Sequence, residues 1–138
     1  MTTQEPIDYF GIPVPFMQFV GLRPEVIDKD YCRTSLSLRP ELTNSRGDIH
    51  GGTIMSVFDF TLSAAARSHA PLETGVMTIE MSTHFMEAVN GDVIIEGRCL
   101  RRGRSIAFCD GTISDAATGK CIAVARATFK LIQKKTGA

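Results

Sequence analysis

Apolar residues along this chain follow two different periods, and the longest helical stretch carries a single charge in its middle. Over residues 51–69 the apolar side chains fall on nearly every side of a 3.6-residue helix, which predicts a helix buried on most of its surface. Pro71 follows the expected end, a common place for a helix stop. Between His50 and Arg67 the only ionisable residue is Asp59, and a carboxylate removed from water needs compensating partners.

The remaining segments alternate apolar and polar residues in short runs, which is the period of β-strands. Two strands are predicted before the helix, over residues 20–27 and 31–39. Four more are predicted after it, over residues 76–87, 92–101, 105–114 and 121–133. Glycine-containing turns connect these four, which predicts an antiparallel meander. The lead-in, residues 1–19, is expected to contain one short helix starting near Pro15.

A helix that is apolar all round needs a curved sheet around it, because one flat face leaves much of it exposed. In the last predicted strand, small residues share one face with Phe129 and Leu131, which favours close packing against a helix. The sequence therefore predicts an α+β fold in which a curved antiparallel sheet of about six strands wraps a long central helix. All 138 residues are expected to form one domain. Its open sheet edges suit pairing with a second copy.

Charge and composition argue against several classes of function. Lys plus Arg and Asp plus Glu number 15 each, so no net field attracts nucleic acid or a membrane surface. No apolar run approaches the roughly 20 residues of a membrane helix, and the first residues lack an export signal. The four cysteines form no C-x-x-C pair and the three histidines are widely spaced. We therefore expect reduced thiols, a cytoplasmic location, and neither a metal nor another cofactor.

Gly51 and Gly52 stand where the first turn of the long helix begins. The first N–H groups of a helix lack internal partners and carry the positive end of its dipole. They therefore suit a carbonyl oxygen that gains negative charge in a reaction, although two glycines before a helix are more often just a turn.

Asp59 follows Gly51 by eight residues, which is about 12 Å along a helix. One helix cannot aim both its N-terminus and this carboxylate at the same small group. Joint action on one substrate therefore predicts a homodimer whose antiparallel helices share each site. The alternative is structural: a buried carboxylate that holds two strands together by hydrogen bonds.

The pattern Asn44-x5-His50-Gly51-Gly52-x6-Asp59 resembles the signature of the hotdog-fold acyl-CoA thioesterases. It is most similar to the phenylacetate-pathway (PaaI-like) group of the 4-hydroxybenzoyl-CoA thioesterase superfamily and to the small mammalian hotdog thioesterases. The resemblance covers residues 44–130. It implies a hotdog fold, hydrolysis of an acyl-CoA thioester to free acid and coenzyme A, and a homodimer that often pairs again into a tetramer. Coenzyme A is then part of the substrate.

The resemblance also implies a role for each motif residue. Asp59 is the expected general base that activates water, or the nucleophile, and the Gly51 N–H is expected to polarise the thioester carbonyl. Asn44 is expected to help hold that carbonyl or the water, and His50 to lie near the thioester. Thr78 is expected to orient the attacking water. His50 fits a capping role in the loop equally well.

A basic turn between two predicted strands consists of Arg101, Arg102, Gly103, Arg104 and Ser105. The resemblance implies that this turn reaches the phosphates of coenzyme A, which the arginine fork suits; a solvated hairpin is the alternative. Gly52 and Phe85 are expected to flank the bound substrate. Arg46 and Arg67 are weaker candidates for phosphate contacts.

Two other functions fit the same fold: an enoyl-thioester hydratase or dehydratase, and a non-catalytic acyl-CoA binder. A histidine directly before two glycines differs from the hydratase pattern, and the presence of Asp59 argues against a binder. A Ser-His-Asp hydrolase is disfavoured because the sequence has no G-x-S-x-G elbow. The phenylalanines and methionines near the motif fit aryl and medium-chain acyl groups equally.

Overall fold

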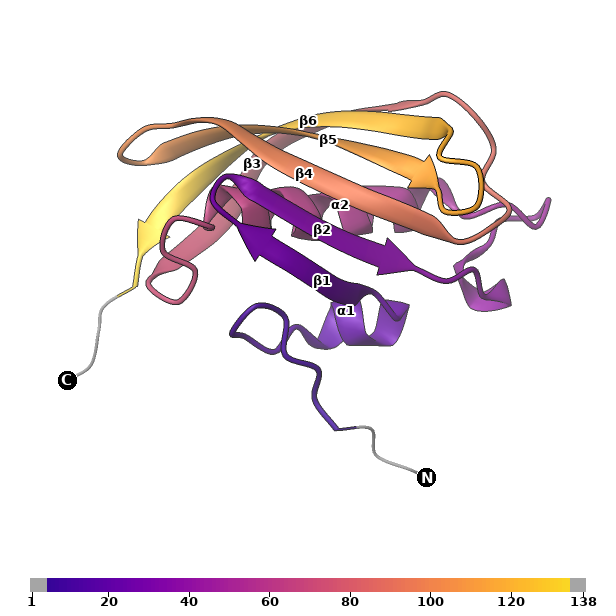
Figure 1. The fold of residues 1–138 in the computed structure, drawn as a ribbon, viewed down its shortest axis with the longest axis horizontal. Helices are drawn as coiled ribbons and strands as arrows, with labels where there is room; N and C mark the ends of the chain where they lie inside the picture. Colours follow the sequence, from indigo (N-terminus) through magenta and orange to yellow (C-terminus); the bar gives the residue numbers. More distant parts are fainter. Residues whose placement is uncertain (1–4, 135–138) are drawn as a thin grey trace.

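One long helix lies under a curved six-stranded sheet in the computed structural model, which describes residues 5–134 (Figure 1). The helices are α1 (Pro15–Val20), the short 3-10 helix η1 (Pro40–Leu42) and α2 (Gly51–Ala66). The strands are β1 (Arg23–Asp28), β2 (Tyr31–Leu36), β3 (Thr74–Phe85), β4 (Val93–Arg102), β5 (Ile106–Asp115) and β6 (Cys121–Gln133). All neighbouring strands are antiparallel. The predicted α+β architecture is therefore confirmed.

The predicted four-strand meander is wrong at its first strand. The sheet order is β1-β2-β4-β5-β6-β3, so β4, β5 and β6 form a meander while β3 pairs with β6 at the sheet edge. The connection from β3 to β4 is too long for a tight hairpin and crosses the end of the sheet. There the carbonyl oxygen of Val89 accepts the N–H of Ile49 at 2.7 Å. This contact ties the connection to the loop before α2, and β4 pairs with β2 instead.

The helix ends earlier than the apolar pattern predicts. Instead of reaching residue 69, α2 stops at Ala66, and the N–H of Ala70 bonds to the carbonyl oxygen of Arg67 in a following turn. No helix within residues 5–134 is both long and apolar enough to cross a bilayer.

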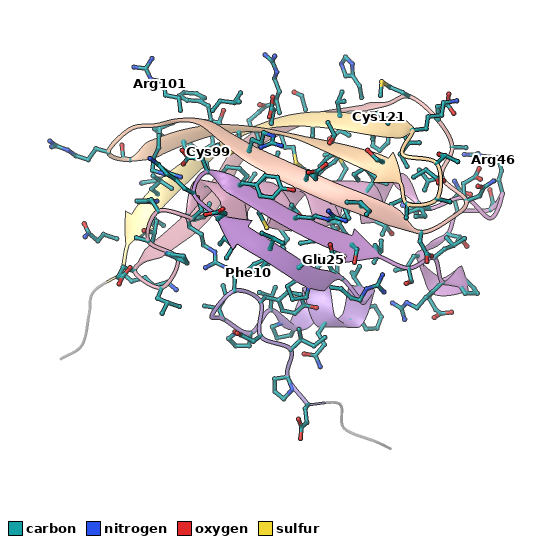
Figure 2. All side chains as sticks on the ribbon, in the orientation of Figure 1. Phe10, Glu25, Arg46, Cys99, Arg101 and Cys121 are labelled. Carbon is teal, nitrogen blue, oxygen red and sulfur yellow. The ribbon has the colours of Figure 1, made fainter. Side chains whose placement is uncertain are left out.

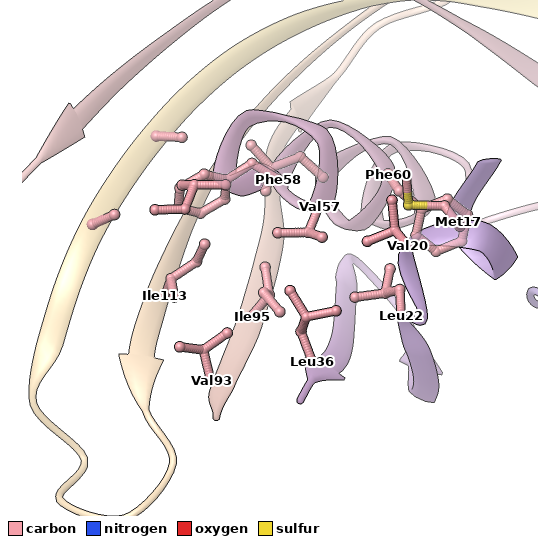
Figure 3. Close-up of a cluster of buried hydrophobic side chains, with 14 of the residues drawn as sticks. Met17, Val20, Leu22, Leu36, Val57, Phe58, Phe60, Val93, Ile95 and Ile113 are labelled. Atoms are coloured by element: carbon pink, nitrogen blue, oxygen red, sulfur yellow. The ribbon is translucent and has the colours of Figure 1, made fainter. Parts of the chain in front are cut away.

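The core forms where α2 meets the inner face of the sheet. Val57 and Phe58 of the helix pack in one buried cluster with Ile95 and Ile113 of the central strands (Figure 3). The helix packs tightly against the sheet at Gly97 and Gly111. A Cβ at Gly111 would lie 2.4 Å from Leu62 Cδ1 and 2.7 Å from the carbonyl oxygen of Glu96. The absence of a side chain at Gly111 therefore sets the distance between helix and sheet.

The described part of the lead-in, residues 5–19, contributes to the core, whereas residues 1–4 lie outside the described residues. Tyr9 is fully buried and its hydroxyl donates to the carbonyl oxygen of Leu22 at 2.8 Å. Arg67 is also buried, and its guanidinium donates to the carbonyl oxygens of Tyr9, Phe10 and Pro71. Arg67 thus joins the lead-in to the end of α2. This corrects the expectation that Arg67 is a candidate for phosphate contacts, since its donors are already used inside the protein.

We expect Gly111→Ala to lower the free energy of unfolding by about 1–3 kcal/mol, because the new methyl group overpacks the contact with Leu62. The matched control is Gly75→Ala, another strand glycine, whose added Cβ would meet the nearest atom at an ordinary 3.5 Å. Urea unfolding of the two variants and the wild type measures the difference. Equal stability of both variants would show that Gly111 does not limit the approach of α2.

Candidate active site

The N-terminus of α2 presents one unused hydrogen-bond donor. His50 is the N-cap, and its Nδ1 accepts the N–H of Gly52 at 2.8 Å. The carbonyl oxygen of His50 accepts the N–H groups of Thr53 and Ile54. Within residues 5–134 nothing accepts the N–H of Gly51. This donor, at the positive end of the helix dipole, is available to a ligand oxygen.

Asn44 is held in place by its own loop. Its Oδ1 accepts the N–H of Arg46 at 2.9 Å and that of Asp48 at 3.2 Å. Gly47 allows this tight turn because its φ is 84°, in the left-handed region. Nothing among residues 5–134 accepts a hydrogen bond from the side-chain NH2 of Asn44, so this group can donate to a ligand.

A hollow of about 360 Å³ adjoins both donors. Asn44, Gly51 and Phe85 all line this N-terminal hollow, and the Phe85 ring lies 3.6 Å from where a Cβ of Gly51 would be. Its apolar lining also includes Ile49, Ile54, Met86, Ala88 and Val89. Its charged lining residues take part in two ion pairs, Arg46–Asp48 at 3.5 Å and Glu87–Lys120 at 2.8 Å.

Asp59 lies on the least covered side of α2. It is half-buried, as are Met55, Ser56 and Ser63, which share this open stripe of the helix. The sheet and the lead-in cover the other sides, so the prediction of a helix buried on most of its surface is confirmed, and this stripe is the exception in the single chain. The Thr78 hydroxyl donates to Asp59 Oδ1 at 2.5 Å. Among residues 5–134 this is the one hydrogen bond to the carboxylate, so Oδ2 is available.

A β-bulge in β3 places two predicted site residues on the same face. Thr78 pairs with Phe129 and Phe85 pairs with Ala123, both buried residues of β6. Seven positions separate Thr78 from Phe85, so a regular strand would direct them to opposite faces. Ile79 is the extra residue of the bulge, and it restores the common orientation. Bulges are frequent beside active sites because they redirect side chains in this way.

The predicted residues form two groups within one chain. Asn44, His50 and Gly51 lie at the start of α2, whereas Asp59 and Thr78 lie about 12 Å along the axis. One chain therefore does not bring the carboxylate to the glycine N–H.

The basic turn, residues 101–105, lies at the opposite end of α2. Arg102 donates to the carbonyl oxygens of Ala65 and Ala66 at the end of α2, and pairs with Asp30 at 2.8 Å. The guanidinium of Arg102 thus caps the helix C-terminus, which corrects the expectation that it is free for phosphate. Figure 2 shows Arg101, the residue before it, at the opposite end of the molecule from Arg46.

The other residues of the basic turn are exposed. The N–H of Gly103 closes the hairpin by donating to Ile106, and the carbonyl oxygen of Ser105 accepts the N–H of Leu131. Arg101 and Arg104 form no ion pair with any residue in the described range. Their guanidinium groups are therefore available to an anionic ligand, whereas that of Arg102 is not.

Sequence reasoning did not identify the capping role of Arg102 or the open stripe on α2. A basic residue near a helix C-terminus is favourable, but Arg102 lies 36 residues after Ala66 in the sequence. Its capping role therefore could not be predicted from local sequence. No three His, Cys, Asp or Glu side chains within residues 5–134 are arranged to hold a metal ion.

Comparison with known proteins identifies the family. The sequence model described as the thioesterase superfamily matches residues 46–122, and the chain belongs to this superfamily. Acyl-coenzyme A thioesterase 13 of Homo sapiens is 29% identical over 98 residues, 70% of this chain and 69% of that protein.

Solved structures show the same fold. A conserved protein of Pseudomonas aeruginosa is 26% identical and has a TM-score of 0.81, covering 86% of this chain and 94% of its own. The PaaI protein of the E. coli phenylacetic acid degradation operon also has a TM-score of 0.81, at 14% identity, over 88% of this chain and 87% of its own. The hotdog fold implied by the sequence motif is confirmed.

We expect His50→Ala to lower the free energy of unfolding by about 1 kcal/mol, because α2 loses its N-cap acceptor. His50→Asn is the matched control, since asparagine is among the best N-cap residues and should retain the wild-type stability. Thermal unfolding of the three proteins measures this effect. Unchanged stability of His50→Ala would contradict the capping role, and loss of activity in a stable His50→Asn would indicate a chemical role for the ring.

Proposed function

We propose that this protein is an acyl-CoA thioesterase that hydrolyses an acyl thioester to a free acid and coenzyme A. The observation that supports this most directly is the half-exposed Asp59 carboxylate. One oxygen of this carboxylate is held by Thr78 and the other is available. Membership of the thioesterase superfamily supports the general reaction.

In the proposed reaction Asp59 acts as general base. Thr78 fixes Oδ1, and Oδ2 takes a proton from the water that attacks the thioester carbon. The carbonyl oxygen, which gains negative charge, accepts the N–H of Gly51 from the second subunit. The Asn44 amide next to this N–H donates to the same oxygen or to the water. A helix N-terminus stabilises such an oxyanion because its donors are already oriented. If Asp59 instead attacks directly, the same donors stabilise the resulting oxyanion.

A homodimer completes this site. Two α2 helices packed antiparallel along their open stripes bring the Asp59 of each chain towards the glycines of the other. The two sheet edges support β3 as the contact strand, because its exposed Met77 and Ile79 are apolar. The other edge, β1, carries Pro24, which cannot donate to a neighbouring strand. We propose that such dimers pair again into a tetramer.

Substrate binding follows from the groups that remain free. Arg101 and Arg104, with the backbone of Gly103 and Ser105, would hold the phosphates of coenzyme A. Gly52 and Phe85 would flank the pantetheine arm near the thioester. The apolar lining of the N-terminal hollow fits aryl and medium-chain acyl groups. The proposal needs no metal or further cofactor, and we propose a cytoplasmic location.

We expect Asp59→Asn to lower kcat for acyl-CoA hydrolysis by about 10²–10⁴-fold with little change in KM, because the general base is lost. Thr78→Val should lower kcat less, since it removes only the donor that orients the base. Glu80→Gln, which neutralises an exposed carboxylate on the same strand, is the matched control. Release of free thiol from aryl and straight-chain acyl-CoAs measures the rates. No release by the wild type from any of them would indicate a binding protein.

Mixing Asn44→Ala and Asp59→Asn proteins under subunit exchange should restore about one quarter of the wild-type activity, because half of the dimers are mixed and each mixed dimer has one intact site. Each variant alone serves as the control. A mixture no more active than the two parents would rule out a site shared between subunits, while leaving the role of Asp59 to its own variant.

A further inference from the structure

Two cysteines ten residues apart face each other on the two strands of one hairpin. Cys99 of β4 is the direct register partner of Cys109 of β5, and both are free thiols. Cys109 is buried, at 2% exposure, whereas Cys99 is partly open to solvent. The other two cysteines have no such partner, because Cys32 lies opposite Gly97 and Ile27, and Cys121 lies opposite Ser114.

The backbone places this pair where a disulfide fits without rearrangement. The N–H of Cys99 donates to the carbonyl oxygen of Asp30 at 3.0 Å, on the β2 side of β4. In an antiparallel ladder the N–H and C=O of one residue point to the same neighbour, so Cys99 and Cys109 form a non-hydrogen-bonded pair. Such pairs have Cα atoms about 4.5 Å apart, and disulfides span Cα separations of roughly 4.4–6.8 Å.

The two thiols have different surroundings. A hydrogen bond from Cys109 lowers the pKa of Cys99 to about 7, and the nearby Arg102 guanidinium acts in the same direction against burial. The same hydrogen bond, together with burial, raises the pKa of Cys109. Burial also raises the pKa of Cys32, to about 12. A partly exposed thiolate beside a cation is the environment of reactive cysteines, so Cys99 is the thiol that reacts first.

We propose that Cys99 and Cys109 form a peroxide-oxidisable dithiol that closes reversibly to a disulfide. The Cys99 thiolate attacks the O–O bond of hydrogen peroxide, which yields a sulfenic acid and hydroxide. The Cys109 thiol then attacks the Cys99 sulfur, an S–S bond forms, and the sulfenic oxygen leaves as water. Two electrons pass from the two sulfurs to the peroxide, and a small-molecule thiol returns both cysteines to the reduced state.

The disulfide would close a short loop around the basic turn. Residues 100–108, which include Arg101 and Arg104, lie between the two cysteines. Oxidation would therefore restrict the hairpin that carries these two free guanidinium groups. This inference does not depend on thioester hydrolysis, so either proposal can fail without the other.

The test treats the native reduced protein with hydrogen peroxide, blocks the remaining thiols by alkylation and maps the peptides by mass spectrometry. We expect a Cys99–Cys109 cross-link with a loss of about 2 Da, reversed by dithiothreitol, while Cys32 is alkylated in full after unfolding. The proposal would be overturned if both Cys99 and Cys109 were still alkylated at a peroxide dose that oxidises Cys121. Cys99 that proceeds to sulfinic acid beside a free Cys109 would also overturn it.

Single substitutions separate the two roles. In Cys109→Ala, Cys99 should accumulate as a sulfenic acid that dimedone traps, because no thiol is left to condense with it. In Cys99→Ser, Cys109 should stay reduced because it is buried. Cys121→Ser, which replaces a partly buried cysteine without a partner, is the matched control and should still form the cross-link. Should either variant fail to fold, the wild-type peptide map and this control decide the matter alone.

Discussion

The close contact between α2 and the centre of the sheet holds the helix, and with it the candidate site residues, in place on the sheet. Leu62 lies over Gly111, and the carbonyl oxygen of Thr61 over Gly97. The spaces that side chains would fill at these two glycines are occupied by the helix itself. Because interiors are packed without slack, α2 cannot slide or rotate on the sheet without a collision. The position of Leu62 therefore determines where the N-terminus, the middle and the C-terminus of the helix lie.

The helix then acts as a fixed spacer between chemically different groups. Its N-terminus carries the unbonded Gly51 N–H, its middle carries Asp59, and its C-terminus is capped by Arg102 from the basic turn. Since an α-helix rises about 1.5 Å per residue, the groups lie roughly 10 Å or more apart along its axis in a single chain. The side of α2 that the sheet leaves open is also the side that carries Asp59. A second antiparallel helix on that side is the simplest arrangement that lets the separated groups act together.

Local features of this fold follow from the sequence, and long-range pairings do not. The position and burial of α2 could be predicted because a helix with apolar residues on nearly every side is stable only when most of its surface is buried. The last strand was predicted at residues 121–133 and is found as Cys121–Gln133. The place of β3 could not be predicted, because it depends on the contact between Val89 and Ile49. No local rule encodes that contact.

The candidate site likewise has one part that could be predicted from the sequence and one part that could not. Its motif from Asn44 to Asp59 lies on one loop and one helix, so spacing along the chain was enough to locate its parts. Thr78 was placed by the family resemblance, but its orientation depends on the bulge at Ile79, and alternation alone would have directed Phe85 away from the helix. The roles of Arg67 and Arg102 were misjudged for a related reason. From sequence alone, a charged side chain is expected to face solvent. Only the folded structure shows that backbone carbonyl oxygens accept hydrogen bonds from these two arginines.

The two ends of α2 show how stability and chemistry are separated on one element. At the C-terminus, where no reaction is proposed, Arg102 supplies donors to the last carbonyl oxygens and the helix dipole is compensated. At the N-terminus His50 satisfies Gly52 but leaves Gly51 without an acceptor. Gly51 is partly exposed, so water satisfies this N–H until a ligand oxygen replaces it. Within residues 5–134 the Gly51 N–H is left open at one end, while Arg102 caps the last carbonyl oxygens at the other, and this open donor is available to a ligand oxygen.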